Sequence, residues 1–429
     1  MRSVPAAPAD TKRREAWSCK ARVVLITRLF GGGAKTRTVD EISWLRSSAV
    51  KSALRAWWRA GHAHEFSSLD TLRTKEEELF GASGTFGPNG TLKGGPGALE
   101  VTTQSHLAIP PTEYREPLAD PLNYALFPAQ GMGQPAAKVA AASDQSWSSI
   151  TLASSSDEKA IHALLVESLR LWLTLGGAGS RTRRGAGAVA APKPVDAREL
   201  GLPSSLGELE DFLRTHCKRQ QVPPSLDGVF CLARTRRIFL GPAQTSGEEA
   251  QRKLLAVLRG IRQDRPRPNG GWGRSHWPEP DAIRLKENPK KNWVHSPSAE
   301  NAERYPRAAL GLPIVVHFKD RAPTEPEEHQ ILGAQPDEQG WRKIERYSSP
   351  VLLRPVCVWE KDRAQYIPVA IFTDCTLPSD VRPLVTTKPK GDLVLSDVVR
   401  NYGILNHADE TLLKIESAFE QASGFRPLL

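Results

Sequence analysis

A loop that combines glycine with arginine is the clearest chemical feature of this sequence. The segment LGGAGSRTRRGAGAV, residues 175–189, places three arginines among five glycines. Glycine lets a backbone approach a ligand closely, and successive N–H groups can then form an anion-binding concavity. Arginine adds forked donors that match phosphate oxygens. The segment therefore predicts a phosphate-binding loop. Its candidate contacts are Gly176, Gly177, Gly179, Arg181, Arg183 and Arg184.

The order of elements around this loop argues against a buried nucleotide. A Rossmann loop runs from a strand through glycines into a helix, so that the pyrophosphate meets a helix N-terminus. Here a predicted helix at about 157–175 precedes the glycines and a short strand follows them. Because a helix C-terminus repels phosphate, this order favours the extended backbone of a nucleic acid. The GGGAKT segment at 31–36 is no P-loop, since Ala34 replaces a required glycine.

A predicted helix, SSAVKSALRAWWRAGH at 47–62, has two contrasting faces. Its apolar face has the helical spacing of a core stripe, and its opposite face is basic with one tryptophan. A basic face is usually solvated, but a tryptophan between arginines can also stack the bases of a single strand. The residues alone leave both interpretations open. The apolar face holds Val50, Ala53, Leu54 and Trp57, and the basic face holds Lys51, Arg55, Trp58, Arg59 and His62.

A second basic and aromatic segment lies at about 263–297. It is rich in arginine, proline, glycine and tryptophan, and it contains the candidate RNA contacts Arg274 and Trp277. Such a segment is typical either of a loop that contacts RNA or protein, or of a disordered surface excursion.

Support for catalysis is weak. The GHAHE segment brings His62 and His64 close together, and two histidines could act as the acid–base pair of a ribonuclease. No HExxH pattern or third metal ligand follows, and no nucleophile arrangement is present. We therefore predict no metal and no cofactor, with a metal-independent nuclease as the alternative.

Length and composition indicate two domains and a polyanionic partner. The chain has 429 residues, a formal net charge of +10 and a pI of about 9.4. The five cysteines lack CxxC spacing and predict free thiols in a reducing compartment. No targeting or membrane-spanning segment is evident, so we expect a cytoplasmic protein without a membrane partner.

The predicted elements run strand, helix, paired strands, helix, strand, which is the split β-α-β-β-α-β unit of an α+β, ferredoxin-like (RRM-like) fold. The first strand is expected at 21–30. We predict a flexible arm at 1–20, a first domain at 21–191 with a loop-rich insertion at about 80–146, and a second α+β domain at 192–429. In the second domain we expect helices near 206–219, 247–262 and 408–422, a strand near 228–240, and the strand runs LPIVVHF, SSPVLLRPVCVW and QYIPVAIFT.

Seven segments, in order along the chain, resemble the RAMP proteins of CRISPR systems, and more closely the first subunits of type III-B (Cmr) effector complexes. Residues at about 80–146 show no such match. The matching segments are ITRLFGGGA, LRSSAVKSALRAWWRA, EEELFGA, LGGAGSRTRRGAGAV, RSHWPEPDAIR, RAALGLPIVVHF and RYSSPVLLRPV.

The resemblance implies tandem ferredoxin-like domains and a non-catalytic, RNA-binding subunit of a ribonucleoprotein that serves antiviral defence. In such a complex this subunit caps the end that holds the 3′ part of the guide RNA and helps capture target RNA. The expected partners are guide RNA, single-stranded target RNA and other RAMP subunits. A ribonuclease that trims guide-RNA precursors and a purely structural cap are the alternatives. The resemblance places RNA contacts at Lys51, Arg55, Trp58, Arg59, Gly31, Gly32 and Gly33 and in the glycine-rich loop.

Overall fold

The structure is a computed structural model. It describes residues 17–429, except for 87–91, 118, 132–134, 264–276, 289, 294, 319–324, 339, 376, 378–379 and 388–407. Most of the predicted N-terminal arm, residues 1–16, thus lies outside the described residues. None of the helices in the described part has the length and apolarity that crossing a bilayer requires.

The first strand starts earlier than predicted and is interrupted. β1 spans Trp17–Leu25, and a short β2 follows at Leu29–Phe30. Between them the Thr27 hydroxyl donates a hydrogen bond of 2.7 Å to the Gly185 carbonyl and accepts one of 2.8 Å from the Ala188 N–H. The backbone leaves β1 at this point because it pairs with the glycine-rich loop instead of a strand.

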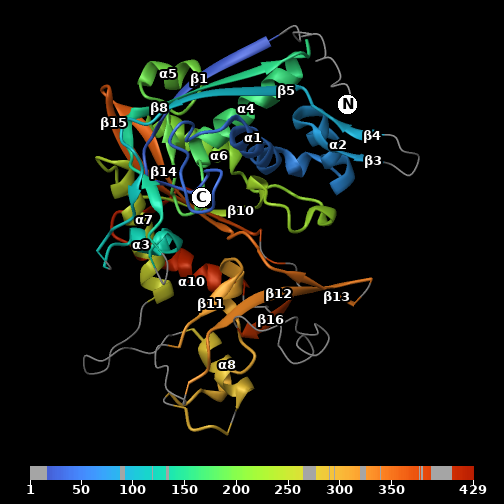
Figure 1. Ribbon diagram of the computed structural model, residues 1–429, viewed down its shortest axis with the longest axis vertical. Helices are drawn as coiled ribbons and strands as arrows, with labels where there is room; N and C mark the ends of the chain where they lie inside the picture. Colours follow the sequence, from blue (N-terminus) through green and yellow to red (C-terminus); the bar gives the residue numbers. More distant parts are fainter. Residues whose placement is uncertain are drawn as a thin grey trace, which may run out of the picture.

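The first sheet has four antiparallel strands in the order β5-β8-β1-β9. Along the chain its elements run strand, helix, strand, strand, helix, strand, as the sequence predicted. Helices α1 and α4 lie on one side of this sheet (Figure 1). The elements beyond β1 are α1 (Ser47–His62), β5 (Leu99–His106), β8 (Ser143–Ser154), α4 (Lys159–Leu175) and β9 (Val189–Ala190).

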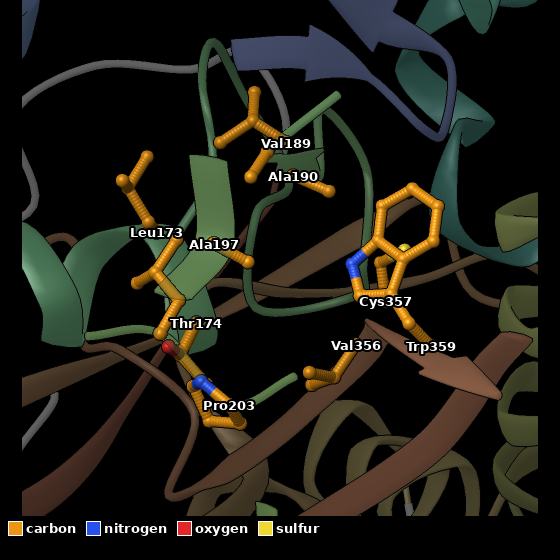
Figure 2. A pocket seen from close by; sticks show the side chains of 11 residues that line it. Leu173, Thr174, Val189, Ala190, Ala197, Pro203, Val356, Cys357 and Trp359 are labelled. Atoms are coloured by element: carbon orange, nitrogen blue, oxygen red, sulfur yellow. The ribbon is translucent and has the colours of Figure 1, made fainter. Parts of the chain in front are cut away.

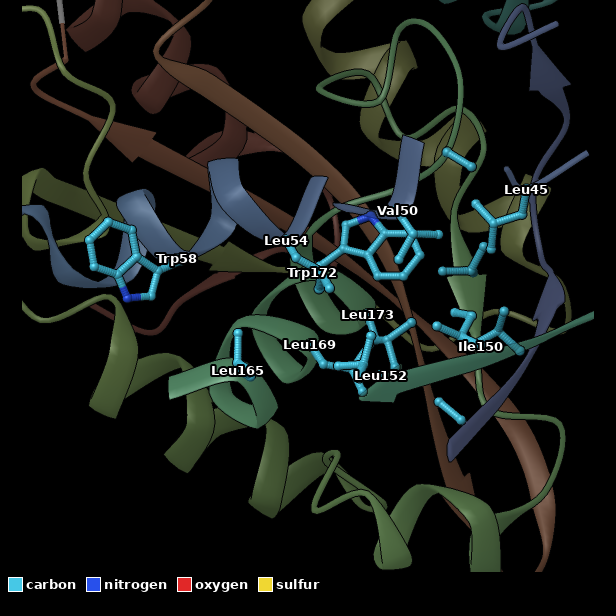
Figure 3. Packing of buried hydrophobic residues seen from close by; sticks show 14 of the residues in the cluster. Leu45, Val50, Leu54, Trp58, Ile150, Leu152, Leu165, Leu169, Trp172 and Leu173 are labelled. Atoms are coloured by element: carbon cyan, nitrogen blue, oxygen red, sulfur yellow. The ribbon is translucent and has the colours of Figure 1, made fainter. Parts of the chain in front are cut away.

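The first core forms between this sheet and its helices. Alternate residues of β1 turn toward the helices, so that Val23 and Leu25 are buried. Figure 3 shows Leu54 of α1, Trp172 of α4 and Leu152 of β8 in the same cluster. A further helix, α2 (Leu69–Phe80), begins at a Ser68 capping box and packs beside α1.

The second sheet repeats the strand order of the first. Its order is β14-β15-β10-β17, again fully antiparallel, and its elements alternate with helices in the same way. The runs SSPVLLRPVCVW and QYIPVAIFT do form strands, but the predicted strand at 228–240 begins only at Thr235. The elements are β10 (Thr235–Leu240), α7 (Gly247–Gln263), β14 (Val351–Glu360), β15 (Arg363–Thr373), α10 (Ala408–Gln421) and β17 (Arg426–Pro427).

A third sheet is inserted into the second unit. The sequence predicted its strand β11 (Ile314–Val316), within the run LPIVVHF, but not the sheet as a whole. It lies at the end of the molecule farthest from the first sheet (Figure 1). Strand β12 is its centre, with β11 and β13 along one edge and β16 along the other. Its elements are α8 (Glu279–Glu287), β11 (Ile314–Val316), β12 (His329–Asp337), β13 (Gly340–Ile344) and β16 (Arg382–Thr387).

The region predicted as an insertion at about 80–146 is only partly one. It supplies β5 and the start of β8, which are integral strands of the first sheet. The rest forms a hairpin and a small sheet with β2, and its helix α3 packs against α7 of the second unit. Asp120 fixes this contact through an ion pair of 3.0 Å with Arg252. The added elements are β3 (Ala82–Phe86), β4 (Leu92–Gly95), β6 (Thr112–Glu113), α3 (Leu122–Ala125) and β7 (Lys138–Ala140).

Apolar side chains of the two units pack against each other. Leu171 and Leu175 of α4 share a cluster with Ile238 and Ile371 of the second sheet. Helices α5 (Pro194–Glu199) and α6 (Leu206–His216) follow the predicted boundary at 192. Ala197 of α5 packs in the first core, so this boundary in the sequence does not divide the cores.

Candidate nucleic-acid interface

The start of the glycine-rich loop is built for packing. A Cβ on Gly176 would lie 2.4 Å from Trp172 Cδ1 and from Trp57 Nε1, so only glycine fits between these rings. The Trp172 indole donates a hydrogen bond of 3.0 Å to the Gly177 carbonyl. Gly176 is buried and Gly177 half-buried. These two glycines let α4 end tightly, and the expectation that they contact RNA is wrong for Gly176.

The next part of the loop lies against the glycine turn that follows β2. The Ser180 N–H donates a hydrogen bond of 2.7 Å to the Phe30 carbonyl. A Cβ on Gly32 would lie 3.4 Å from the Cα of Gly179, and both glycines have positive φ, +89° and +72°. Two glycine segments that the sequence singled out separately therefore form one surface. We call residues 31–33 and 179–181 the glycine ridge.

The glycine ridge has an open centre and a cation at its end. Gly32, Gly179 and Arg181 are exposed, whereas Gly31 is buried and Gly33 half-buried. Arg181 adopts φ +63°, a conformation that costs a non-glycine residue about 1 kcal/mol or more and is found preferentially at functional sites. The ridge thus combines accessible backbone with a positive charge.

Arg183 and Arg184 do not belong to this exposed surface. The Arg183 guanidinium donates a hydrogen bond of 2.7 Å to the Ser349 carbonyl and lies 3.9 Å from the centroid of the Phe230 ring. The Arg184 guanidinium donates one of 2.9 Å to the Val351 carbonyl. Burial lowers the pKa of each guanidinium to about 10, so both keep their charge at neutral pH. The structure does not bring these two arginines to the ridge as the sequence predicted, because the second unit binds them.

Trp58 also departs from its predicted place. Its side chain is 1% exposed and packs against the rings of Phe66 and Phe80, with centroids 5.8 and 6.1 Å away. The predicted apolar stripe was too narrow, because α1 is covered by α4 on one side and by α2 on another. A base cannot stack on this ring.

The cations of α1 are held by groups of the protein. Arg55 and Arg59 both bind the buried carboxylate of Glu76 on α2, Arg59 through bonds of 2.6 and 2.7 Å. Burial raises the pKa of Glu76, but the hydrogen bonds from Arg59 and Arg55 outweigh it and hold that pKa below its usual range. Lys51 donates to the carbonyls of Pro96 and Leu99. The helix cations therefore have structural partners. In the sequence, the acidic run EEELF, which begins at Glu76, is the signal that could have indicated a carboxylate partner for these cations.

The tryptophan of the second basic segment is buried as well. Trp277 is 6% exposed, with Lys414 Nζ 5.7 Å from its ring centroid, so it offers no stacking face. Arg274 lies outside the described residues.

The RSHWPEPDAIR signature contains a buried ionic cluster that sequence reasoning missed. Arg284 binds Glu325 at 2.8 Å and Asp281 at 3.2 Å. Glu279, fully buried, accepts from the Arg307 backbone and guanidinium at 2.7 and 3.0 Å. These carboxylates hold the loop after α8 in place. The proline and acidic residues at the start of α8 were the sequence signal for this arrangement.

The two histidines proposed for catalysis are not a free pair. His62 is 6% exposed, and its Nδ1 lies 2.9 Å from Glu65 and its Nε2 3.5 Å from Glu167. Burial lowers the pKa of His62, but the neighbouring carboxylates of Glu167 and Glu65 outweigh it and raise that pKa above its usual value. Among the described residues, no group of three or more histidine, cysteine and acidic side chains could hold a metal ion. All five cysteines are free thiols, as predicted.

A small pocket lies between the two units, behind the end of α4 (Figure 2). Its volume is about 20 Å³, which is room for about one water molecule. Thr174, whose buried hydroxyl has no hydrogen-bond partner, faces it among apolar side chains. The pocket is too small for a nucleotide. Its other labelled residues are Leu173, Val189, Ala190, Ala197, Pro203, Val356, Cys357 and Trp359.

The first unit matches a known family. Residues 22–190, from β1 through β9, match the family model of the RAMP superfamily. We refer to this region as the RAMP domain because of this match. The resemblance to RAMP proteins predicted from the sequence is confirmed, and the RAMP domain includes both segments of the glycine ridge.

Two solved structures are similar to this chain over most of its length. The whole chain is similar to Cmr1 from Pyrococcus furiosus in its apo form, with 14% sequence identity, a TM-score of 0.47, and coverage of 96% of this chain and 98% of that chain. It is also similar to a chain in the type III-B Cmr-beta complex bound to cognate target RNA and AMPPnP in the presence of ssDNA. There the identity is 10%, the TM-score 0.39, and the coverage 93% of this chain and 98% of that chain. A search of curated proteins found no match.

Proposed function

We propose that this chain is a non-catalytic, RNA-binding subunit of a type III-B CRISPR effector complex. In this role it caps the end of the complex that holds the 3′ part of the guide RNA, and it helps capture single-stranded target RNA. The RAMP domain and the seven ordered sequence signatures support membership of such a complex. We also propose that the two units, which share one strand order, are tandem ferredoxin-like domains.

The observation that carries RNA binding is the glycine ridge. Exposed backbone at Gly32 and Gly179 lets a phosphate approach closely, and Arg181 provides a forked donor beside it. Lys35 adds an exposed cation in the turn after Gly33. Contacts of this kind hold a phosphate backbone without reading its sequence, which suits a subunit whose specificity comes from guide–target pairing.

The environment of His62 favours the non-catalytic proposal over the ribonuclease alternative. A general acid or base must reach the reacting oxygen within hydrogen-bond distance, and His62 is buried with a glutamate near each ring nitrogen. Binding to free RNA distinguishes the proposed function from that of a purely structural cap, because such a cap would have negligible affinity for free RNA.

A salt titration of RNA binding tests the proposal directly. The full chain is mixed with labelled single-stranded RNA over a range of salt, and each sample is divided between a binding assay and a denaturing gel with chelator. We expect intact RNA and binding that falls steeply with salt. For single strands, each lost phosphate contact lowers the slope of log K against log salt by about 0.7. Arg181→Ala and Lys35→Ala should each show this decrease.

Arg73→Ala is the matched control. Arg73 is exposed on α2, away from the glycine ridge, and its substitution removes the same charge. Its slope should equal that of the wild type. Equal slopes in all variants would show that the glycine ridge does not contact the RNA. RNA that is cut in the presence of chelator would favour the ribonuclease alternative.

A further inference from the structure

Among the residues that the structure describes, no helix covers the second face of the first sheet. Helices α1 and α4 occupy one side, and alternate residues of the three long strands point to the other. Most of these residues are exposed, three on β8 are half-buried, and Val24 and Ala153 are buried. We call the exposed and half-buried residues the open face. It comprises Ser18, Lys20 and Arg22 of β1, Glu100, Thr102, Gln104 and His106 of β5, and Trp147, Ser149 and Thr151 of β8.

The strand register arranges the open face in rows. Arg22 pairs with Ser149, which pairs with Gln104, and in the next row Trp147 pairs with His106. Directly opposite residues on one face have Cβ atoms about 4.5–5.5 Å apart. Each row is therefore a short track of hydrogen-bonding groups that crosses the sheet.

An arginine and a tryptophan lie together at one end of these rows. The Arg22 guanidinium is 4.6 Å from the centroid of the Trp147 ring, and the His106 ring centroid is 6.1 Å from the same ring. Trp147 is half-buried, because it also packs against a small apolar cluster that includes Val24 and Tyr366. The cluster fixes the indole, while Arg22 stays exposed.

The chemistry of the open face fits single-stranded RNA better than a protein. The open face carries one carboxylate, Glu100, and three basic side chains, those of Lys20, Arg22 and His106. Its remaining polar groups are mainly hydroxyls and an amide. The core of a protein–protein interface is apolar and depleted of charge. Unstacked RNA bases instead stack on aromatic rings and guanidinium planes, and their edges bind polar side chains.

We propose that the open face is a second surface for single-stranded RNA, separate from the glycine ridge, on which a base stacks on the Arg22–Trp147 pair and Lys20 contacts a phosphate. This inference takes one thing from the proposed function, which is that the ligand is RNA. It assigns a role to residues that no sequence motif indicated.

Substitutions on the open face of the full chain test the inference. With labelled oligouridine as the probe, Arg22→Ala should weaken binding about five-fold or more, as expected for the loss of one stacked base. Arg22→Lys keeps the charge but loses the planar group, so it should also bind more weakly. Lys20→Ala should lower the salt slope by about 0.7. Trp147→Phe, which keeps a ring, should bind more tightly than Trp147→Ala.

Three comparisons make the outcome decisive. Arg73→Ala should bind like the wild type, and thermal unfolding shows that the variants are folded. If open-face variants bind like the wild type while Arg181→Ala binds weakly, the inference is overturned and the proposed function stands. If open-face variants bind weakly while Arg181→Ala binds normally, the inference is supported and the ridge is not the site. Wild-type protein that binds no oligouridine would overturn both, and open-face variants that lose only partner subunits would make this face a protein interface.

Discussion

The guanidinium of Arg184 donates a hydrogen bond of 2.9 Å to the carbonyl of Val351, and so joins the glycine-rich loop of the RAMP domain to the first residue of β14 in the second unit. The backbone follows the same path, since the Leu353 N–H donates to the Arg183 carbonyl at 3.0 Å. β14 is the edge strand of the second sheet, and an uncovered edge would expose unpaired backbone groups. The loop that presents the glycine ridge therefore also pairs with this edge strand and covers part of it.

Arg184→Ala should loosen the joint between the two units. The substitution leaves the Val351 carbonyl without its guanidinium donor and removes one of the two donors of the Ser349 hydroxyl, which still accepts from the Val351 N–H. A buried group left without its donor costs about 1–3 kcal/mol, so we expect the free energy of unfolding to fall by about 1–3 kcal/mol. Urea denaturation measures this change. Arg73→Ala should stay within about 0.5 kcal/mol of the wild type. An unchanged urea midpoint for Arg184→Ala would show that the joint is not stabilising.

Glu76→Gln should destabilise the contact between α1 and α2, most strongly at neutral pH. The folded state holds the pKa of Glu76 low, because its carboxylate binds Arg59 and Arg55. A depressed carboxyl pKa contributes stability above the unfolded value of about 4.3, and this stability is lost as the pH falls through the folded pKa. The gap in unfolding free energy between wild type and variant should therefore be largest near pH 7 and narrow below about pH 4.

Glu77→Gln provides the matched control for this pH series. Glu77 is exposed on the same helix, and its substitution should have little effect at any pH. A gap for Glu76→Gln that does not change with pH would contradict the pairing with Arg55 and Arg59. The same pairing predicts that Arg55→Ala lowers stability and leaves the salt dependence of RNA binding unchanged.

The sequence predicted the local elements of the RAMP domain well, because their signals are local. Helix α1 was placed within one residue of its ends, and the glycine segments were recognised from their composition. The direction in which Trp58 points could not be predicted in the same way. It depends on α2 covering a second side of α1, which is a tertiary contact.

The roles of Arg183 and Arg184 were hidden for a similar reason. Their partners, Ser349 and Val351, lie more than 160 residues away along the chain. A glycine- and arginine-rich composition is the same whether the arginines bind phosphate or carbonyl oxygens of a neighbouring sheet. The third sheet was missed because its short strands interrupt the predicted order of the second unit.

Arg354→Ala should be the most damaging single substitution between the units. Its guanidinium is fully buried and donates to the carbonyls of Leu173 and Thr174 at the end of α4 and of Val189 in β9, at 2.9–3.0 Å. Loss of three donors and of the side-chain volume should lower the free energy of unfolding by about 3–5 kcal/mol. Chemical denaturation measures it, with the exposed Arg363→Ala as control. A loss below about 1 kcal/mol would contradict this role.

His62→Gln should weaken the protein most at acidic pH, the reverse of the Glu76 variant. The folded state raises the pKa of His62, because the neighbouring carboxylates of Glu167 and Glu65 outweigh the effect of burial. A raised histidine pKa contributes stability that is fully present below the unfolded value of about 6.5 and is lost as the pH rises through the folded pKa. The gap between wild type and His62→Gln in unfolding free energy should therefore be largest below about pH 6.5 and shrink as the pH rises above it. Arg73→Ala, whose side chain is exposed on α2, is the control and should show no such trend. A gap for His62→Gln that widens with pH would mean that His62 is neutral in its pocket, and would reopen its role as a general base.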